Sequence, residues 1–281
     1  MTAIAIEIKT DIRPIGVFDS GIGGMTVLKE LIRKFPNENF IYLGDTARLP
    51  YGSKSGNTVR KYSVQNMNFL ISRNVKALVV ACNTASTQIF ETEFETIPVY
   101  NVIDPGAKLA SQTTENKKIA VLGTRATVKA GTYITKIKAY LPEAEIFSQA
   151  CPLFVPLAEE GWHDDPITNL IAYRYLQNIK TEDVDTVVLA CTHYPLLKIS
   201  IARVFGNQVK LIDSGEAIAA EINFDFENGR IKKNISGETA ESNRKLLICL
   251  TDSGEQFENL SLRLLSEVTA LQPVFETVSV I

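Results

Sequence analysis

Residues 187–195 read Val187-Val188-Leu189-Ala190-Cys191-Thr192-His193-Tyr194-Pro195, an apolar, β-branched run that ends in a cysteine. Polar residues, a histidine and a proline follow at once, a pattern typical of a buried strand that turns into a helix. We therefore expect the Cys191 thiol at the carboxyl end of a strand. The pattern occurs earlier as Ala77-Leu78-Val79-Val80-Ala81-Cys82-Asn83-Thr84, and the two cysteines are 109 residues apart. Two such strand ends indicate a duplicated arrangement.

Other apolar runs alternate with helical patterns along the chain. A run at Ile15–Asp19 is closed by a glycine-rich turn, Asp19-Ser20-Gly21-Ile22-Gly23-Gly24, and apolar residues then recur at helical spacing up to Pro36. Further strands are expected at residues 40–45, 98–104, 119–124, 209–213 and 246–250, and one more before Cys151. Strands that alternate with helices predict βαβ units and parallel sheets. The polar stretch 223–245 is expected to be a loop.

The first and second rounds of this pattern align at three points. These are Ile15-Gly16-Val17 with Ile119-Ala120-Val121, Cys82 with Cys191, and Ile103-Asp104 with Ile212-Asp213. We therefore predict an α/β fold of two similar doubly wound parallel-sheet domains, related by pseudo-symmetry, with the active site in the cleft between them. The predicted domains are residues 14–105 plus 216–281 and residues 106–215, and residues 1–13 form an N-terminal extension. The last strand has no third round to join, so it is expected to complete the first domain.

The composition is that of an ordinary globular protein. Of 281 residues, 45% are hydrophobic and 22% are charged, so a sizeable core can form. A net charge of −3 gives no electrostatic reason to expect nucleic acid as a partner. No apolar run approaches the ~20 residues of a membrane span. Residues 1–13 lack a basic segment followed by an apolar one, so we expect no signal peptide, no membrane partner and a cytoplasmic location.

The cysteine and histidine spacing argues against disulfides and metal. The chain has four cysteines and two histidines, without a closely spaced Cys-Cys pair. In a reducing compartment the cysteines should be free thiols. The paired ligands of a structural zinc site are missing, so no metal is expected. Cys151 and Cys249 are expected only to pack in the core.

The glycine-rich turn does not predict a nucleotide site. It lacks the spacing of G-x-x-x-x-G-K-[ST], and a G-x-G at Gly21–Gly23 is followed three residues later by Thr26. The turn could bind a carboxylate through its amides, or it could be only a tight connection between strand and helix. Phosphatase chemistry is excluded because Gln88 and Leu197, six residues after the two cysteines, replace the arginine it requires.

Two thiols across one cleft suit a particular reaction. A cysteine in an apolar strand usually only packs. Cys82 and Cys191, however, end their strands and precede helix-opening polar residues, where a helix N-terminus favours thiolate. One thiol could remove a proton from one face of a small substrate while the other supplies a proton to the opposite face, which inverts a stereocentre. His193 and Glu159 could shuttle protons, although Glu159 could also be a solvated loop charge.

Four motifs lie in order between Pro14 and about Ser214: the turn at residues 19–24, Gly44-Asp45 with Pro50-Tyr51-Gly52, Ala81-Cys82-Asn83-Thr84-Ala85, and residues 190–195. Together they resemble the motifs of bacterial glutamate racemases, in the aspartate/glutamate racemase family. The resemblance implies interconversion of L- and D-glutamate without pyridoxal phosphate, metal or another cofactor, with D-glutamate supplied for peptidoglycan. It also implies a homodimer.

The resemblance also implies roles for individual residues. Cys82 would deprotonate D-glutamate and Cys191 would deprotonate L-glutamate, with Asp19, Glu159 and His193 as auxiliary proton-handling groups. The implied substrate-binding residues are Asp19, Ser20, Tyr51, Gly52, Asn83, Thr84, Thr127, Thr192 and His193. These motifs contain no guanidinium, so hydroxyls, amides and backbone N–H groups are expected to hold the two carboxylates.

Two alternatives stay open from the sequence. The first keeps the fold and the thiols but changes the substrate to aspartate or another acid handled by related racemases. The second is a two-lobed binding protein whose cysteines only pack. Comparing the turnover of glutamate and aspartate tests the first alternative. Replacing Cys82 or Cys191 by serine tests the second, which predicts that ligand function is kept.

Overall fold

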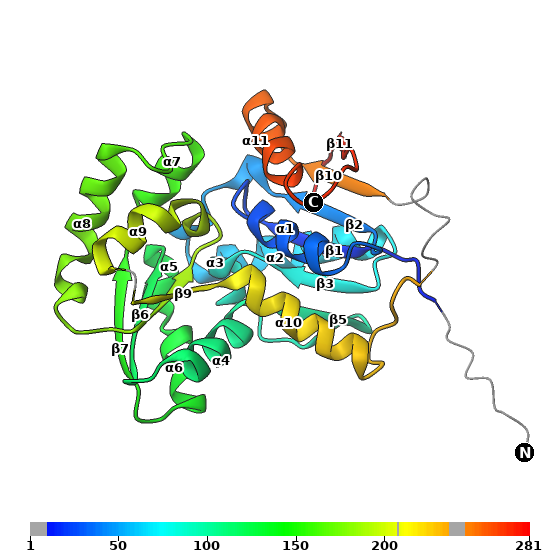
Figure 1. Cartoon of the computed structure of the whole chain (residues 1–281). Helices are drawn as coiled ribbons and strands as arrows, with labels where there is room; N and C mark the ends of the chain where they lie inside the picture. Colours follow the sequence, from blue (N-terminus) through cyan, green and yellow to red (C-terminus); the bar gives the residue numbers. More distant parts are fainter. Residues whose placement is uncertain (1–9, 207, 236–244) are drawn as a thin grey trace, which may run out of the picture.

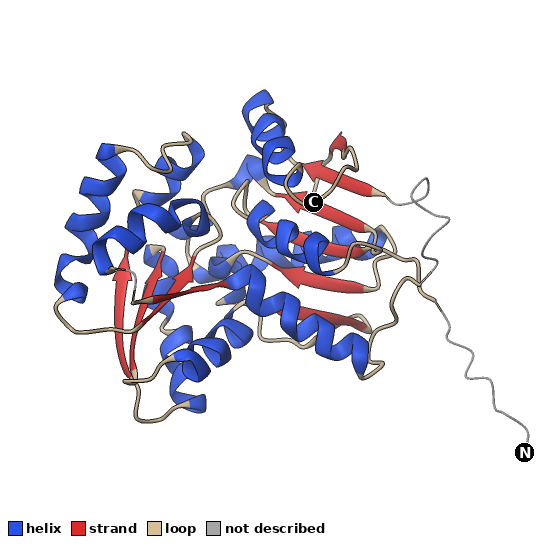
Figure 2. Ribbon diagram, viewed as in Figure 1, coloured by secondary structure: helices blue, strands red, loops and turns tan. Residues whose placement is uncertain are grey.

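The computed structural model describes residues 10–206, 208–235 and 245–281. Two β-sheets, each with helices on both faces, lie side by side, and the described C-terminal end belongs to the larger one (Figure 1, Figure 2). The first nine residues of the predicted extension and residues 236–244 of the polar stretch lie outside the described residues. No helix in the described ranges is long and apolar enough to cross a membrane.

The larger sheet is parallel except at one edge. Its strands lie in the order β11 (Val274–Thr277), β10 (Leu246–Leu250), β2 (Phe40–Gly44), β1 (Ile15–Asp19), β3 (Ala77–Val80), β5 (Ile97–Asn101) and β4 (Glu93–Phe94). β4 pairs antiparallel with β5, and the other pairs are parallel.

The smaller sheet repeats the central order of the larger one. Its strands are β7 (Glu145–Ala150), β6 (Lys118–Gly123), β8 (Thr186–Ala190) and β9 (Lys210–Asp213), all parallel. The order β7-β6-β8-β9 matches β2-β1-β3-β5, so β3 and β8, the strands before the two cysteines, occupy equivalent places. The predicted class of two similar α/β parallel-sheet units is confirmed.

Helices connect the strands and cover both faces of each sheet (Figure 1). Those around the larger sheet are α1 (Met25–Lys34), α2 (Gly56–Ser72), α3 (Asn83–Ser86), α10 (Ser214–Glu227) and α11 (Glu255–Leu265), with the short 3₁₀ turns η1 (Thr46–Arg48) and η2 (Tyr51–Ser53). Those around the smaller sheet are α4 (Ile103–Thr113), α5 (Arg125–Ala130), α6 (Thr132–Tyr140), α7 (Phe154–Glu159), α8 (Pro166–Lys180), η3 (Tyr194–Leu197) and α9 (Lys198–Phe205).

Each face of each sheet has its own hydrophobic cluster, because successive strand residues point to opposite faces. In the larger sheet, Val17 packs in one cluster with Leu28 of α1, whereas Phe18 packs in another with Leu70 of α2. In the smaller sheet, Val187 lies in the cluster of α8 and α9 and Val188 in the cluster of α4 and α6. Burial on both faces explains why these strands are continuous apolar runs.

Two sequence expectations were wrong at element ends. The strand expected at residues 98–104 ends at Asn101, and α4 begins at Ile103, because the Asn101 side chain accepts the N–H groups of Ile103 and Asp104. Ile103-Asp104 therefore begins a helix, whereas Ile212-Asp213 ends β9, so the predicted alignment of these two pairs is wrong. The loop expected from residue 223 begins only after Glu227, because Ile222 and Phe226 continue the buried face of α10.

The predicted domain boundaries stay a prediction. The parallel pairing of β10 with β2 supports the assignment of the C-terminal segment to the first domain.

Candidate active site

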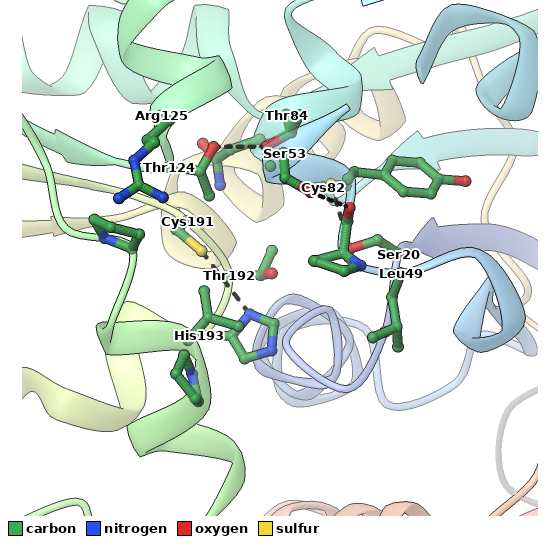
Figure 3. A pocket seen from close by; sticks show the side chains of 18 of the residues that line it. Ser20, Leu49, Ser53, Cys82, Thr84, Thr124, Arg125, Cys191, Thr192 and His193 are labelled. Carbon is green, nitrogen blue, oxygen red and sulfur yellow. Dashed lines mark hydrogen bonds between the residues drawn. The ribbon is translucent and has the colours of Figure 1, made fainter. Parts of the chain in front are cut away.

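Cys82 and Cys191 line one cavity at the carboxyl ends of β3 and β8 (Figure 3). Both side chains are nearly buried, with 5% of each residue exposed. The cavity has a volume of about 250 Å³, which suits a small metabolite, since drug-sized ligands occupy roughly 300–1,000 Å³. It is lined by Ser20, Gly21, Leu49, Pro50, Tyr51, Gly52, Ser53, Cys82, Asn83, Thr84, Thr124, Arg125, Pro152, Val155, Pro156, Glu159, Cys191, Thr192 and His193.

On one side of the cavity, Cys191 belongs to a chain of polar groups. The Cys191 Sγ lies 3.8 Å from Nδ1 of His193, and the other ring nitrogen, Nε2, lies 3.0 Å from Oε1 of Glu159. Burial lowers the pKa of His193, but the hydrogen bonds with Cys191 and Glu159 outweigh burial and raise it to about 10. The imidazole is therefore protonated at neutral pH. Both ring N–H groups then donate, one to the sulfur and one to the carboxylate.

On the other side, Cys82 faces Ser20 and the buried Asp19. The Cys82 thiol donates to Ser20 Oγ at 3.9 Å. Burial raises the pKa of Cys82, and the charge of Asp19 raises it further. The expectation that a helix N-terminus would favour thiolate is wrong for Cys82, because α3 has four residues and its amides do not offset burial. Cys82 is a thiol at neutral pH.

The glycine-rich turn binds a carboxylate of the protein itself. The amides of Gly21 and Gly24 donate to Oδ2 of Asp19 at 3.0 and 3.1 Å, and the Thr192 hydroxyl donates to Oδ1 at 3.3 Å. Burial raises the pKa of Asp19, and the charge of His193 and these amides oppose that rise. Asp19 is fully buried and does not line the cavity. Of the two alternatives left open for this turn, the amides that could have held a ligand carboxylate instead orient a buried acid beside Cys82.

Close packing explains the glycines of this turn. A Cβ at Gly23 would lie 2.4 Å from both Nδ1 of His193 and Oγ1 of Thr192. At Gly24 it would lie 2.4 Å from the Asp19 Cβ. Gly23 therefore contacts His193 and Thr192 beside Cys191, and Gly24 contacts Asp19 beside Cys82. Only glycine, which has no side chain, fits at these two positions.

Three threonine hydroxyls form a ring that joins the two sheets' loops. Oγ1 of Thr84, after β3, lies 3.0 Å from Oγ1 of Thr124 and 3.2 Å from Oγ1 of Thr127, and the latter two are 3.0 Å apart. We call these residues the threonine triangle. Thr84 and Thr124 line the cavity, whereas Thr127 is buried behind them. Thr127, predicted to bind substrate, thus reaches the cavity only through its neighbours.

The loop from Leu49 to Ser53 forms the opposite wall. The Tyr51 hydroxyl donates to Asp45, a buried carboxylate that also accepts from Arg48. Gly52 packs against Thr124, with an added Cβ only 2.8 Å from the threonine Cβ. Asp45 and Tyr51 therefore hold this loop against the smaller sheet's side of the cavity.

The structure brings most of the predicted residues together. Those that line the cavity are Ser20, Tyr51, Gly52, Cys82, Asn83, Thr84, Glu159, Cys191, Thr192 and His193. Ser53, Thr124 and Arg125 also line it but were not predicted. Thr124 and Arg125 directly follow β6, so the rule that ligands bind outside the carboxyl ends of parallel strands could have identified them. Arg125 adds a guanidinium to the cavity wall, although the motifs of the sequence analysis contain none.

The arrangement can hold and move protons without an obvious metal site. No cluster of three or more His, Cys, Asp or Glu side chains within the described ranges could hold a metal ion. The four cysteines are free thiols. The cavity instead presents two sulfurs, neutral hydroxyls and amides, one carboxylate–imidazolium pair and one arginine.

Comparison with known proteins gives one consistent result. The sequence pattern of the family described as Asp/Glu/Hydantoin racemase matches residues 22–222. A glutamate racemase from Geobacter metallireducens is 51% identical over 209 residues, 74% of this chain and 77% of that protein. Glutamate racemase isoform RacE1 from Bacillus anthracis superposes with a TM-score of 0.86 at 34% identity, covering 95% of this chain and 97% of the other. The glutamate racemase of Francisella tularensis, solved in complex with D-glutamate, superposes with a TM-score of 0.85 at 37% identity, covering 96% and 98%.

Proposed function

The chain belongs to the Asp/Glu/hydantoin racemase family, and we propose that it interconverts L- and D-glutamate: one of Cys82 and Cys191 removes the α-proton from one face, and the other delivers a different proton to the opposite face. The observation that carries the proposal is that both sulfurs line one small cavity from equivalent strand ends. A two-base inversion needs an acid and a base on opposite faces of the α-carbon, and two thiols can fill both roles.

The surroundings of the two thiols support a direction for each. Cys191, beside the His193 imidazolium, is the base toward L-glutamate: its thiolate takes the α-proton and becomes a thiol. Cys82, whose pKa is raised by burial, is the acid: its thiol gives a proton to the opposite face and becomes a thiolate. The reverse reaction exchanges the two roles. One proton enters and one leaves the substrate carbon in each direction.

The neighbouring groups can return the two thiols to the protonation states that the next turnover needs. Glu159 accepts from His193 and stabilises the imidazolium that balances the Cys191 thiolate. Asp19, whose pKa burial raises, is placed to exchange a proton on the Cys82 side. Ser20, Asn83, Thr84 and Thr192 offer hydroxyls and an amide to the ammonium and α-carboxylate. Tyr51 and Gly52 form the wall opposite, and Thr127 acts through Thr84.

The family resemblance supports three further parts of the proposal. D-glutamate would be supplied for peptidoglycan, the protein would work in the cytoplasm as a homodimer, and no cofactor would take part. Each is testable apart from the chemistry at the two cysteines.

The decisive experiment follows label and enantiomer together. Pure L-glutamate is incubated in deuterated water with chelator and no added cofactor, for the wild type and for C82S, C191S and the control C151S. Cys151 is buried and does not line the cavity, so C151S makes the same chemical change without removing a cavity-lining thiol. We expect D-glutamate deuterated at the α-carbon from the wild type and C151S, and a loss of roughly a hundredfold or more in C82S and C191S.

The contrary outcomes are distinct. Unlabelled product, or a strict need for pyridoxal phosphate, contradicts the two-thiol mechanism. Full activity in C82S or C191S means that the cysteines only pack. A higher kcat/KM for aspartate than for glutamate would make aspartate the substrate, as in the first alternative of the sequence analysis.

A further inference from the structure

Arg125 is a charged residue of the cavity wall that the proton transfers leave unused. Glu159 and His193, the other charged groups of the wall, pair with each other at 3.0 Å. Across the described part of the chain, the Arg125 guanidinium has neither a hydrogen-bond nor an ion-pair partner. An unpaired guanidinium at a ligand cavity is available to bind an anion.

Arg125 lies at the rim of the cavity rather than at its floor. It follows Thr124, whose hydroxyl contacts Thr84 and whose Cβ packs on Gly52 of the opposite wall. The Arg125 residue is exposed, whereas Cys82 and Cys191 are nearly buried. In Figure 3 its guanidinium points toward the Cys191 side of the cavity. The residue therefore lies on the outer, solvent-exposed part of the cavity wall.

The chemistry of the substrate decides which group can reach this rim. The reacting α-carbon must lie between the two sulfurs, and its ammonium and α-carboxylate are bonded directly to it. Those two groups therefore stay at the depth of Asn83, Thr84 and Thr192, which are 2%, 4% and 4% exposed. Only the side chain of the substrate extends outward, and in glutamate it ends in a second carboxylate.

We propose that Arg125 binds the side-chain carboxylate of the substrate and makes the pocket selective for a dicarboxylic amino acid. The inference rests on the proposed function, because it takes the α-carbon to lie between the two cysteines. The guanidinium fork matches a carboxylate with two parallel hydrogen bonds, and its charge offsets the net negative charge of the substrate. Glutamine, with an uncharged side-chain amide, gains neither.

The test compares R125Q and R125K with the wild type and with K129Q. Lys129 is exposed on the same helix and does not line the cavity, so K129Q removes the same charge without touching the site. Because a hydrogen bond to a charged group is worth more than a neutral one, KM for glutamate should rise roughly tenfold to a hundredfold in R125Q. The kcat should fall far less, since the reacting groups are unchanged. R125K, which keeps the charge but loses the fork, should give an intermediate KM.

Two further measurements separate direct binding from long-range attraction. The higher KM of R125Q should persist near 1 M salt, where the Debye length is about 3 Å, because a direct contact is screened little. The inhibition constant of D-glutamine should be similar in R125Q and the wild type. An unchanged KM in R125Q, a KM effect abolished by salt, or an equal effect in K129Q overturns the inference while glutamate racemisation by the wild type stands. A wild-type chain that does not racemise glutamate overturns the proposed function, and the inference falls with it.

Discussion

Replacement of Gly23 by alanine should place a methyl group in space that His193 and Thr192 occupy. The new Cβ would lie 2.4 Å from His193 Nδ1 and from Thr192 Oγ1, and 2.7 Å from His193 Cε1, whereas ordinary contacts begin at 3.4 Å. Both side chains would have to retreat by about 1 Å. Because both are 4–5% exposed and held by hydrogen bonds, they have little room to do so.

The expected loss is larger for catalysis than for stability. Overpacking of this kind costs about 1–3 kcal/mol, and each kcal/mol lowers the Tm by about 2–4 °C in a chain of this size. The retreat of His193 would lengthen the 3.8 Å contact between Nδ1 and Cys191 Sγ, which holds the base. A misplacement of about 1 Å in a catalytic group costs on the order of a hundredfold in rate.

The assay follows the circular dichroism signal, which has opposite signs for L- and D-glutamate, with Tm measured on the same preparations. G254A is the control, because a Cβ at Gly254 meets no atom within 4 Å and the residue does not line the cavity. G23A should lose activity in both directions while it stays folded, and G254A should keep most of its kcat. Wild-type kcat and Tm in G23A would refute the argument that this glycine fixes His193.

Two other predictions concern charges. In E159Q the pKa of His193 should fall below its raised value of about 10, because a hydrogen bond that raises it is weakened. The alkaline limb of the pH–kcat profile should then move to lower pH, and an unmoved limb would contradict the role of Glu159. The stability that protonated His193 contributes is fully present below its ordinary pKa of 6.5 and is lost as pH rises through about 10, so in E159Q it should be lost at lower pH. K76M breaks the ion pair between Lys76 and Glu38, whose charged atoms lie 2.6 Å apart and whose side chains are 1% and 4% exposed. Glu38 is then left buried without an ion-pair partner. Urea unfolding should show a loss of about 3–5 kcal/mol, with kcat per folded molecule unchanged because neither residue lines the cavity; a loss below about 1 kcal/mol, the range of an exposed pair, would contradict the burial argument.

The sequence is most informative where one local pattern determines the structure. Strands β3 and β8 are buried on both faces, so they appear as short apolar runs, and the polar residues after each run mark the strand end. The places of Cys82 and Cys191 follow directly. The helical end of α10 was missed because Asn223 and Asp225 interrupt the apolar pattern, although Asp225 is itself buried and accepts from Tyr100.

Other features depend on contacts between distant segments. The Asp19 carboxylate, which accepts the amides of Gly21 and Gly24, is also held by the Thr192 hydroxyl from a segment 173 residues away. The high pKa of Cys82 reflects burial, which the four residues after it do not reveal. Arg125 is a single residue after a strand, without a motif around it. Such positions can be predicted only from the sheet topology.

The threonine triangle gives the cavity wall a choice of hydrogen-bond direction. Each hydroxyl has one proton and two acceptor lone pairs, so the ring can circulate in either sense without movement of a heavy atom. Thr84 can turn its proton to an arriving carboxylate and still accept from Thr124 and Thr127. Thr84 belongs to the larger sheet's side and the other two to the smaller sheet's side, so both bonds across the seam are kept while the bond between Thr124 and Thr127 is given up. The cavity wall can therefore donate a hydrogen bond to a ligand without loosening the contact between the two sheets' loops.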